Sequence, residues 1–100
     1  MALEHAQAAL PPVVLTELLS DPKVTALVKD LFLQLPVLEI TEGYWQRAGL
    51  LRARVRARGR RARLADSLIV QSCLDHDLSL VTRDADFRHF VRLAGIRIVP

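Results

Sequence analysis

The chain has 100 residues, enough for one hydrophobic core, and its 51% hydrophobic and 25% charged residues exclude a disordered chain. We expect no membrane span, because no apolar run approaches about 18–20 residues. We expect no signal peptide either, because the first residues lack a cationic and apolar leader. The single cysteine, Cys73, suits a reducing cytoplasm. The net charge is +3, and the charges are unevenly distributed along the chain. Residues 52–63 contain seven arginines and no acid, whereas the remaining 7 basic and 11 acidic residues have a net charge of −4.

The first half of the chain predicts short strands between short helices. Residues 2–9 have the pattern of a helix end, which a pair of prolines terminates. The run Val13–Thr16 is apolar and rich in β-branched residues, which predicts a buried strand. A helical turn at 17–19 follows it, and apolar residues at helical spacing predict a helix from about 23 to 35. Residues 37–41 predict a second strand.

The second half continues the alternation of helices and strands. The predicted elements are, in order, helices at 42–58 and 64–75, a strand at 78–82, a helix at 85–94 and a strand at 96–99. The first of these helices has an apolar stripe at i, i+4, i+7 and i+11, formed by Tyr44, Ala48, Leu51 and Val55. Alternating strands and helices predict an α/β fold with a short parallel sheet, and we expect one domain over residues 1–100.

Acidic residues occur where a functional site forms in open parallel sheets, at the carboxyl ends of strands. Glu17 directly follows the first predicted strand, Asp84 and Asp86 follow the third, and Asp66 lies in the first turn of the helix 64–75. Converging carboxylates repel one another unless a cation lies between them, and Mg²⁺ and Mn²⁺ prefer oxygen ligands. Metal-assisted hydrolysis of a phosphodiester fits such a site. On spacing alone, the ordinary role of a carboxylate at a helix N-terminus is the stronger interpretation of each acid.

Three strings, in this order, resemble motifs of the PIN domain family. They are V-L-T-E-L-L at 14–19, A-D-S-L-I-V-Q-S at 65–72 and L-V-T-R-D-A-D-F at 80–87. Among PIN domains, the chain looks most like the VapC-type toxins of prokaryotic toxin–antitoxin pairs. The resemblance implies a three-layer α/β/α fold and a cytoplasmic, Mg²⁺- or Mn²⁺-dependent endoribonuclease. It also implies an RNA substrate, a cognate antitoxin and a homodimer.

The family's site residues map onto this sequence one by one. The resemblance implies three catalytic and metal-binding acids, Glu17, Asp66 and Asp84, an auxiliary metal ligand, Asp86, and two supporting hydroxyls, Thr16 and Thr82. The family's central first strand, with a further catalytic Asp, has no counterpart in this sequence. A start codon assigned too late, a fragment of a longer chain and a true truncation each account for this difference, and we favour the first two. The alternative function is a catalytically incomplete PIN-like fragment that binds an antitoxin, itself or RNA.

A basic segment directly precedes Asp66. Its members are all arginines that we expect to bind the RNA backbone: Arg52, Arg54, Arg56, Arg58, Arg60, Arg61 and Arg63. The same cluster also suits an acidic segment of a partner protein, and a solvated helix end in a GC-rich genome is the structural alternative. Tyr44 fits the apolar stripe, so we expect it in the core, whereas Trp45 faces elsewhere and is expected to be partly exposed.

Overall fold

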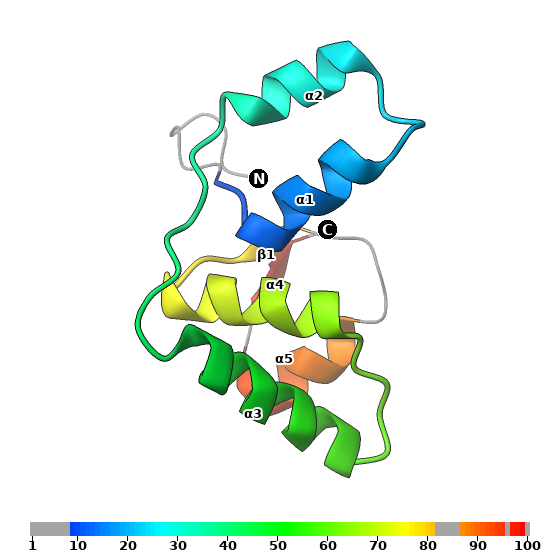
Figure 1. Cartoon of the computed structure of the whole chain (residues 1–100). Coiled ribbons are helices and arrows are strands. Elements are labelled where there is room, and N and C mark those ends of the chain that lie inside the picture. Colours follow the sequence, from blue (N-terminus) through cyan, green and yellow to red (C-terminus); the bar gives the residue numbers. More distant parts are fainter. Residues whose placement is uncertain (1–8, 82–86, 96, 100) are drawn as a thin grey trace. The chain divides into compact units, whose positions relative to one another are not determined.

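The computed structural model describes residues 9–81, 87–95 and 97–99 (Figure 1). The chain divides into two compact units, Met1–Glu39 and Ile40–Pro100. The described elements are, in chain order, α1 (Pro12–Ser20), α2 (Ala26–Leu33), α3 (Tyr44–Ala57), α4 (Leu64–Asp75), β1 (Leu80–Val81), α5 (Arg88–Ala94) and β2 (Ile98–Val99). The helix end that we predicted at residues 2–9 lies almost wholly outside the described residues.

The first unit contains α1, α2 and one isolated parallel bridge between Leu10 and Val37. In this bridge the Leu10 N–H donates to the Pro36 carbonyl at 2.9 Å, and the Leu38 N–H donates to the Leu10 carbonyl at 2.8 Å. The α2 helix begins at a favourable cap, because the Thr25 hydroxyl oxygen accepts a hydrogen bond from the Val28 N–H at 3.3 Å. Neither helix of this unit has a fully buried residue.

The strand predicted at 13–16 is wrong, and of the strand predicted at 37–41 only Val37 pairs within the described residues. Residues 13–16 belong to α1, whose first residue is Pro12. Proline favours the first helical position, because its φ is already near the helical value and the missing N–H would have no helical partner there. The helix-forming Glu17–Leu19 then continues the helix through the β-branched residues. Within the described residues of this unit, the strand pairing is the single bridge between Leu10 and Val37, and Val37 belongs to the second predicted strand.

The second unit is built on α3 and α4, which pack side by side (Figure 1). The predicted stripe is confirmed, since the buried residues of α3 are Tyr44, Ala48, Leu51 and Val55. The Tyr44 hydroxyl donates to the Leu68 carbonyl of α4 at 2.7 Å, and burial raises the pKa of Tyr44. Gly59, with φ +71°, lies just after the end of α3, in a conformation that other residues rarely adopt.

The last two predicted strands pair with each other within the described residues. Leu80 pairs with Ile98 and Val81 with Val99, in parallel register. The α5 helix provides the crossover that parallel strands need, and its C-cap is Gly95 at φ +70°. Phe90 of this helix is 1% exposed, so α5 contributes to the core of the unit beside α3.

Candidate functional site

Asp66 lies in the first turn of α4, as predicted. The helix begins after Arg63, whose carbonyl accepts hydrogen bonds from the Ser67 N–H at 3.1 Å and from the Ser67 hydroxyl at 3.0 Å. Asp66 itself is half-buried. The partial positive charge of the helix N-terminus stabilises an ionised carboxylate at this position. Asp66 therefore has the local setting of a functional acid, and equally that of a helix-stabilising one.

Glu17 and Thr16 are exposed residues in the middle of α1. The sequence placed them after a strand, and this placement is wrong because α1 begins at Pro12. On the helix, the Thr16 hydroxyl is 3.5 Å from the Pro12 carbonyl one turn earlier. Glu17 belongs to the first unit and Asp66 to the second.

The remaining predicted ligands, Asp84 and Asp86, and the supporting Thr82 lie outside the described residues. Over the described ranges, no three His, Cys, Asp or Glu side chains gather closely enough to hold a metal ion. The four-acid site therefore stays a prediction. The described helices also include none that is long and apolar enough to cross a membrane.

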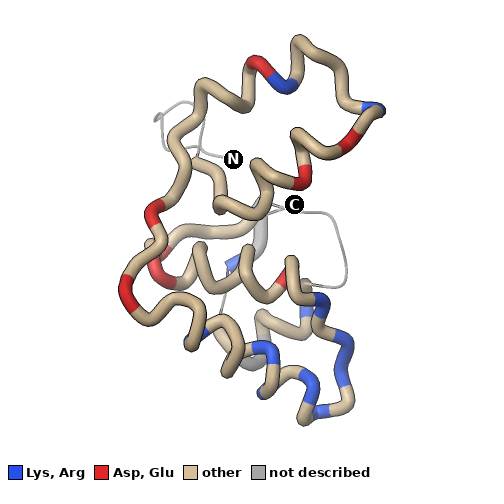
Figure 2. The backbone as a smooth tube through the Cα atoms, viewed as in Figure 1, with Lys and Arg blue, Asp and Glu red and all other residues tan. Residues whose placement is uncertain are grey.

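The basic segment, residues 52–63, occupies the second half of α3 and the connection to α4 (Figure 2). Six of its seven arginines are exposed, and the exception is Arg52. The Nε of Arg52 donates to the Ala62 carbonyl at 2.9 Å, which holds the connection against α3. The exposure of the other six agrees with a surface for anions.

The sequence did not indicate a polar cluster around Asp75, the last residue of α4. Arg47 of α3 donates to both carboxylate oxygens, from Nε to Oδ1 at 3.1 Å and from Nη2 to Oδ2 at 2.7 Å. Gln71 donates to Oδ1 at 2.8 Å, and the Thr41 hydroxyl donates to Oδ2 at 3.1 Å. Burial alone would raise the pKa of Asp75, but these hydrogen bonds hold it below its usual value. The one available signal was a carboxylate at a helix C-terminus, where the dipole disfavours it unless a cation is near.

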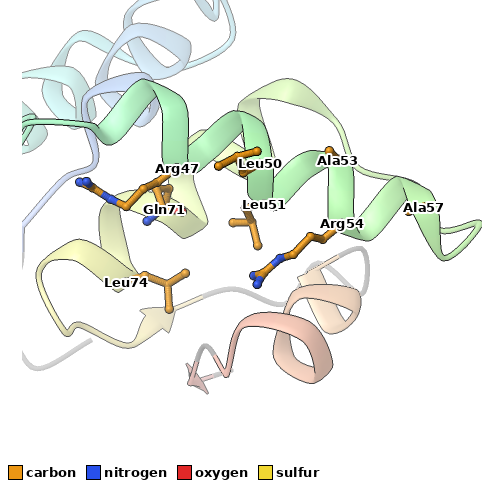
Figure 3. A pocket seen from close by; sticks show the side chains of 8 residues that line it. All are labelled: Arg47, Leu50, Leu51, Ala53, Arg54, Ala57, Gln71 and Leu74. Atoms are coloured by element: carbon orange, nitrogen blue, oxygen red, sulfur yellow. The ribbon is translucent and has the colours of Figure 1, made fainter.

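A groove of about 710 Å³ lies along α3 and α4 within the second unit (Figure 3). Its described lining is mostly apolar and includes Arg47, Leu50, Leu51, Ala53, Arg54, Ala57, Gln71 and Leu74. None of these residues belongs to the predicted acidic site. Leu50 is 68% exposed, a large apolar side chain facing solvent next to this groove.

Comparison with known proteins found a matching family model and a similar solved structure. A family model described as PIN domain matches residues 2–93. No curated protein matches the chain. A crystal structure of a member of the VapBC family of toxin–antitoxin systems, VapBC-5 from Mycobacterium tuberculosis, is similar, with a TM-score of 0.68 and 24% sequence identity, covering 91% of this chain and 79% of that chain. At this identity the likeness establishes the fold.

Proposed function

Because this chain belongs to the PIN domain family, we propose that it is a metal-dependent endoribonuclease of the VapC toxin type, which cleaves RNA phosphodiester bonds. The observation that carries this proposal is the family match over residues 2–93, which extends through both units. We accordingly propose one PIN-like domain over residues 1–100, with α/β/α layers around a parallel sheet that includes β1 and β2.

The proposed metal ligands are carboxylates only: Glu17, Asp66, Asp84 and, as an auxiliary, Asp86. Oxygen-only sets suit Mg²⁺ or Mn²⁺ and differ from the nitrogen and sulfur ligands of structural zinc sites. When bound, the ion supplies an activated water and stabilises the negative charge that develops on the phosphate. Asp66 lies in the first turn of α4, where the partial positive charge of the helix N-terminus favours a carboxylate. Thr16 and Thr82 are proposed to orient carboxylates or waters through their hydroxyls.

The exposed arginines of the basic segment are proposed to bind the RNA backbone. Arg54, Arg56, Arg58, Arg60, Arg61 and Arg63 are exposed, whereas Arg52 is engaged with the Ala62 carbonyl and contributes mainly to folding. Guanidinium groups bind phosphates regardless of base sequence, so this segment would position the backbone without selecting the RNA. The similar VapBC protein belongs to a toxin–antitoxin family, and we propose that this chain likewise has an antitoxin partner, forms a homodimer and acts in the cytoplasm.

A cleavage assay tests the proposal. The full chain is incubated with a labelled RNA of mixed sequence and MnCl₂, alongside the variants Asp66→Asn and Glu17→Gln. Each variant should cleave at least about 100-fold more slowly, because each removes a ligand charge that the proposed ion needs. Asp30→Asn is the matched control, an exposed helical acid of α2 outside the predicted site, and it should cleave as the parent does. Equal cleavage by all four proteins would contradict the proposal.

The alternative is a catalytically incomplete module that binds an antitoxin, itself or RNA. The observation that favours it is the exposed arginines of the basic segment, which can bind an anionic partner without a metal ion. Calorimetric titration of the chain with Mn²⁺ separates the two functions. Saturable Mn²⁺ binding that Asp66→Asn abolishes supports the nuclease, whereas retained RNA binding without any Mn²⁺ binding supports the module.

A further inference from the structure

Trp45 is an exposed aromatic side chain on a helix without acids. It is the single tryptophan of the chain, and it is 61% exposed, whereas tryptophan is highly buried on average. The sequence of α3, from Tyr44 to Ala57, contains four arginines and neither Asp nor Glu. A large aromatic ring and positive charge therefore share one helix.

A buried neighbour supports the indole ring of Trp45. Its ring meets that of Tyr44 in a T-shaped contact, with 5.0 Å between centroids and 74° between planes. Tyr44 is itself 3% exposed, and its hydroxyl donates to the Leu68 carbonyl at 2.7 Å. Because Tyr44 is fixed at both its ring and its hydroxyl, the contact restricts the orientations of Trp45. A ring that is already restricted loses less entropy when a ligand binds to it.

Gly49 and Arg56 share the face of α3 on which Trp45 lies. At about 100° per residue, they lie about 40° and 20° around the helix from Trp45, and all three residues are exposed. A Cβ at Gly49 would meet no described atom within 4 Å, so the helix surface between the indole and the guanidinium is open. With about 1.5 Å of rise per residue, Trp45 and Arg56 are about 16 Å apart along the axis. We call these three residues the Trp45 face.

The Trp45 face extends toward the end of the helix pair that contains Asp66. Arg47, near the beginning of α3, bonds Asp75, the last residue of α4, so the two helices are antiparallel. Arg56 consequently lies at the end of α3 from which the short connection leads into the first turn of α4, where Asp66 is found. A strand bound along this face would be directed toward the predicted acid.

The order of side chains on the Trp45 face fits a single-stranded nucleic acid better than a partner helix. A partner helix needs an apolar stripe, but Gly49 and Arg52 stand at i+4 and i+7 from Trp45. Bases of a single strand can stack on an aromatic ring, and guanidinium groups bind the phosphates between them. In a duplex the bases are stacked on one another and do not reach such a ring.

We propose that Trp45 stacks on a base of single-stranded RNA while Arg56 pairs with a phosphate of the same strand a few nucleotides away. This inference deepens the proposed endoribonuclease function and takes its ligand, RNA, from it. Trp45 is a positioning residue, because it holds the strand at a distance from the reacting phosphate. Stacking tolerates any base, so the contact would add affinity without selecting a sequence.

The fluorescence of Trp45 tests the proposal on the full chain. A 12-nucleotide single-stranded RNA is titrated in EDTA, where metal-dependent cleavage cannot occur, and anisotropy of labelled RNA measures binding in parallel. Since the chain has one tryptophan, any change in emission comes from Trp45. Stacking should quench this emission in proportion to the bound RNA. A sugar-phosphate strand of the same length without bases should bind through the arginines and leave the emission nearly unchanged.

Substitutions separate stacking from electrostatic attraction. Trp45→Ala should weaken RNA binding at least about fivefold without changing the slope of log K against log salt, because stacking releases no counterions. Trp45→Phe should restore part of the affinity. Arg56→Gln should lower the slope by about 0.7, the value for one phosphate contact. The matched control is Leu50→Ala, at a 68% exposed apolar residue about 140° around α3 from Trp45, and it should change binding less than about twofold. Circular dichroism checks that the variants fold.

Several results would overturn the proposal. RNA binding without quenching is one, and equal quenching by the strand without bases is another. Equal weakening by Trp45→Ala and Leu50→Ala would indicate unspecific apolar adhesion. A dimer in sedimentation that Trp45→Ala dissociates, with no quenching by RNA, would assign the face to a second copy. Quenching by RNA in a chain that shows no cleavage with Mn²⁺ would support the RNA contact and contradict only the proposed nuclease activity.

Discussion

Arg47 and Asp75 join the beginning of α3 to the end of α4 through two parallel hydrogen bonds, of 3.1 and 2.7 Å. Such a bidentate pair combines charge with fixed geometry and is stronger than a single neutral hydrogen bond. The Asp75 side chain is only 9% exposed, and Gln71 and Thr41 saturate its remaining acceptor sites. The pair therefore fixes how the two main helices of the second unit meet.

This relationship predicts acid sensitivity. The pKa of Asp75 is lower in the folded chain than its ordinary value, so its stabilising contribution is complete above the unfolded value of about 3.9 and is lost as pH falls through the folded value. Asp75→Asn should lower the free energy of unfolding at pH 7 by on the order of 1 kcal/mol, because charge-assisted hydrogen bonds are lost at a site partly open to solvent. Urea unfolding from pH 2.5 to 7 should show a difference between parent and variant that shrinks toward low pH. A difference independent of pH would contradict the assignment.

Two neighbouring leucines of α3 should respond very differently to truncation. Leu51 is 2% exposed and Leu50 is 68% exposed. Leu51→Ala leaves a cavity in the core and should lower the free energy of unfolding by about 2–5 kcal/mol, whereas Leu50→Ala should change it by less than about 0.5 kcal/mol. Thermal or urea unfolding of both variants measures this. Similar losses would mean that Leu50 is covered in solution.

Two glycines near each other should have opposite effects when replaced by alanine. Gly49 lies inside α3, and a Cβ there would meet no atom within 4 Å, so Gly49→Ala should stabilise the chain by about 0.5–1 kcal/mol. Gly59 also has open space but a φ of +71°, so Gly59→Ala should destabilise the chain by about 1 kcal/mol. Opposite shifts in melting temperature are the expected result. Stabilisation by both substitutions would show that the turn after α3 adopts another conformation.

Cys73 should be unreactive in the folded chain. It is 4% exposed, and burial raises the pKa of its thiol to about 11. At pH 8 the thiol therefore remains protonated, and alkylation by iodoacetamide should be slow until urea unfolds the chain. Since the folded pKa exceeds the unfolded one, this group stabilises the folded state below about pH 9 and does so less as pH rises toward 11. Alkylation at the rate of a free thiol would show that α4 opens readily.

The basic segment should determine how salt affects RNA binding. Replacing the exposed Arg58 and Arg60 together by glutamine should weaken binding of a single-stranded RNA and lower the slope of log K against log salt by about 1.4, at about 0.7 per phosphate contact. Arg52→Gln should instead act mainly on stability, because its guanidinium holds the Ala62 carbonyl. Titrations between 50 and 300 mM KCl measure the slopes. An unchanged slope in the double variant would place the RNA elsewhere.

Local patterns were sufficient for the helices of the second unit. The burial of Tyr44, Ala48, Leu51 and Val55 follows from spacing along one helix, and the bounds of α4 and the cap at Gly95 follow from residues near each end. The parallel pairing of β1 and β2 fits the helix that lies between them in the chain.

Tertiary structure decided what no local pattern contains. Residues 13–16 are compatible with either a strand or a helix. They are helical because α1 begins at Pro12, whereas the strand pairing described in this unit joins Leu10 and Val37. Arg47 and Asp75 are 28 residues apart, so their spacing in the sequence did not predict the ion pair. The sequence by itself determined which residue types are present for metal, phosphate and core, because these are chemical properties of side chains. Packing alone decided which of them meet, since such contacts depend on how distant segments fold together.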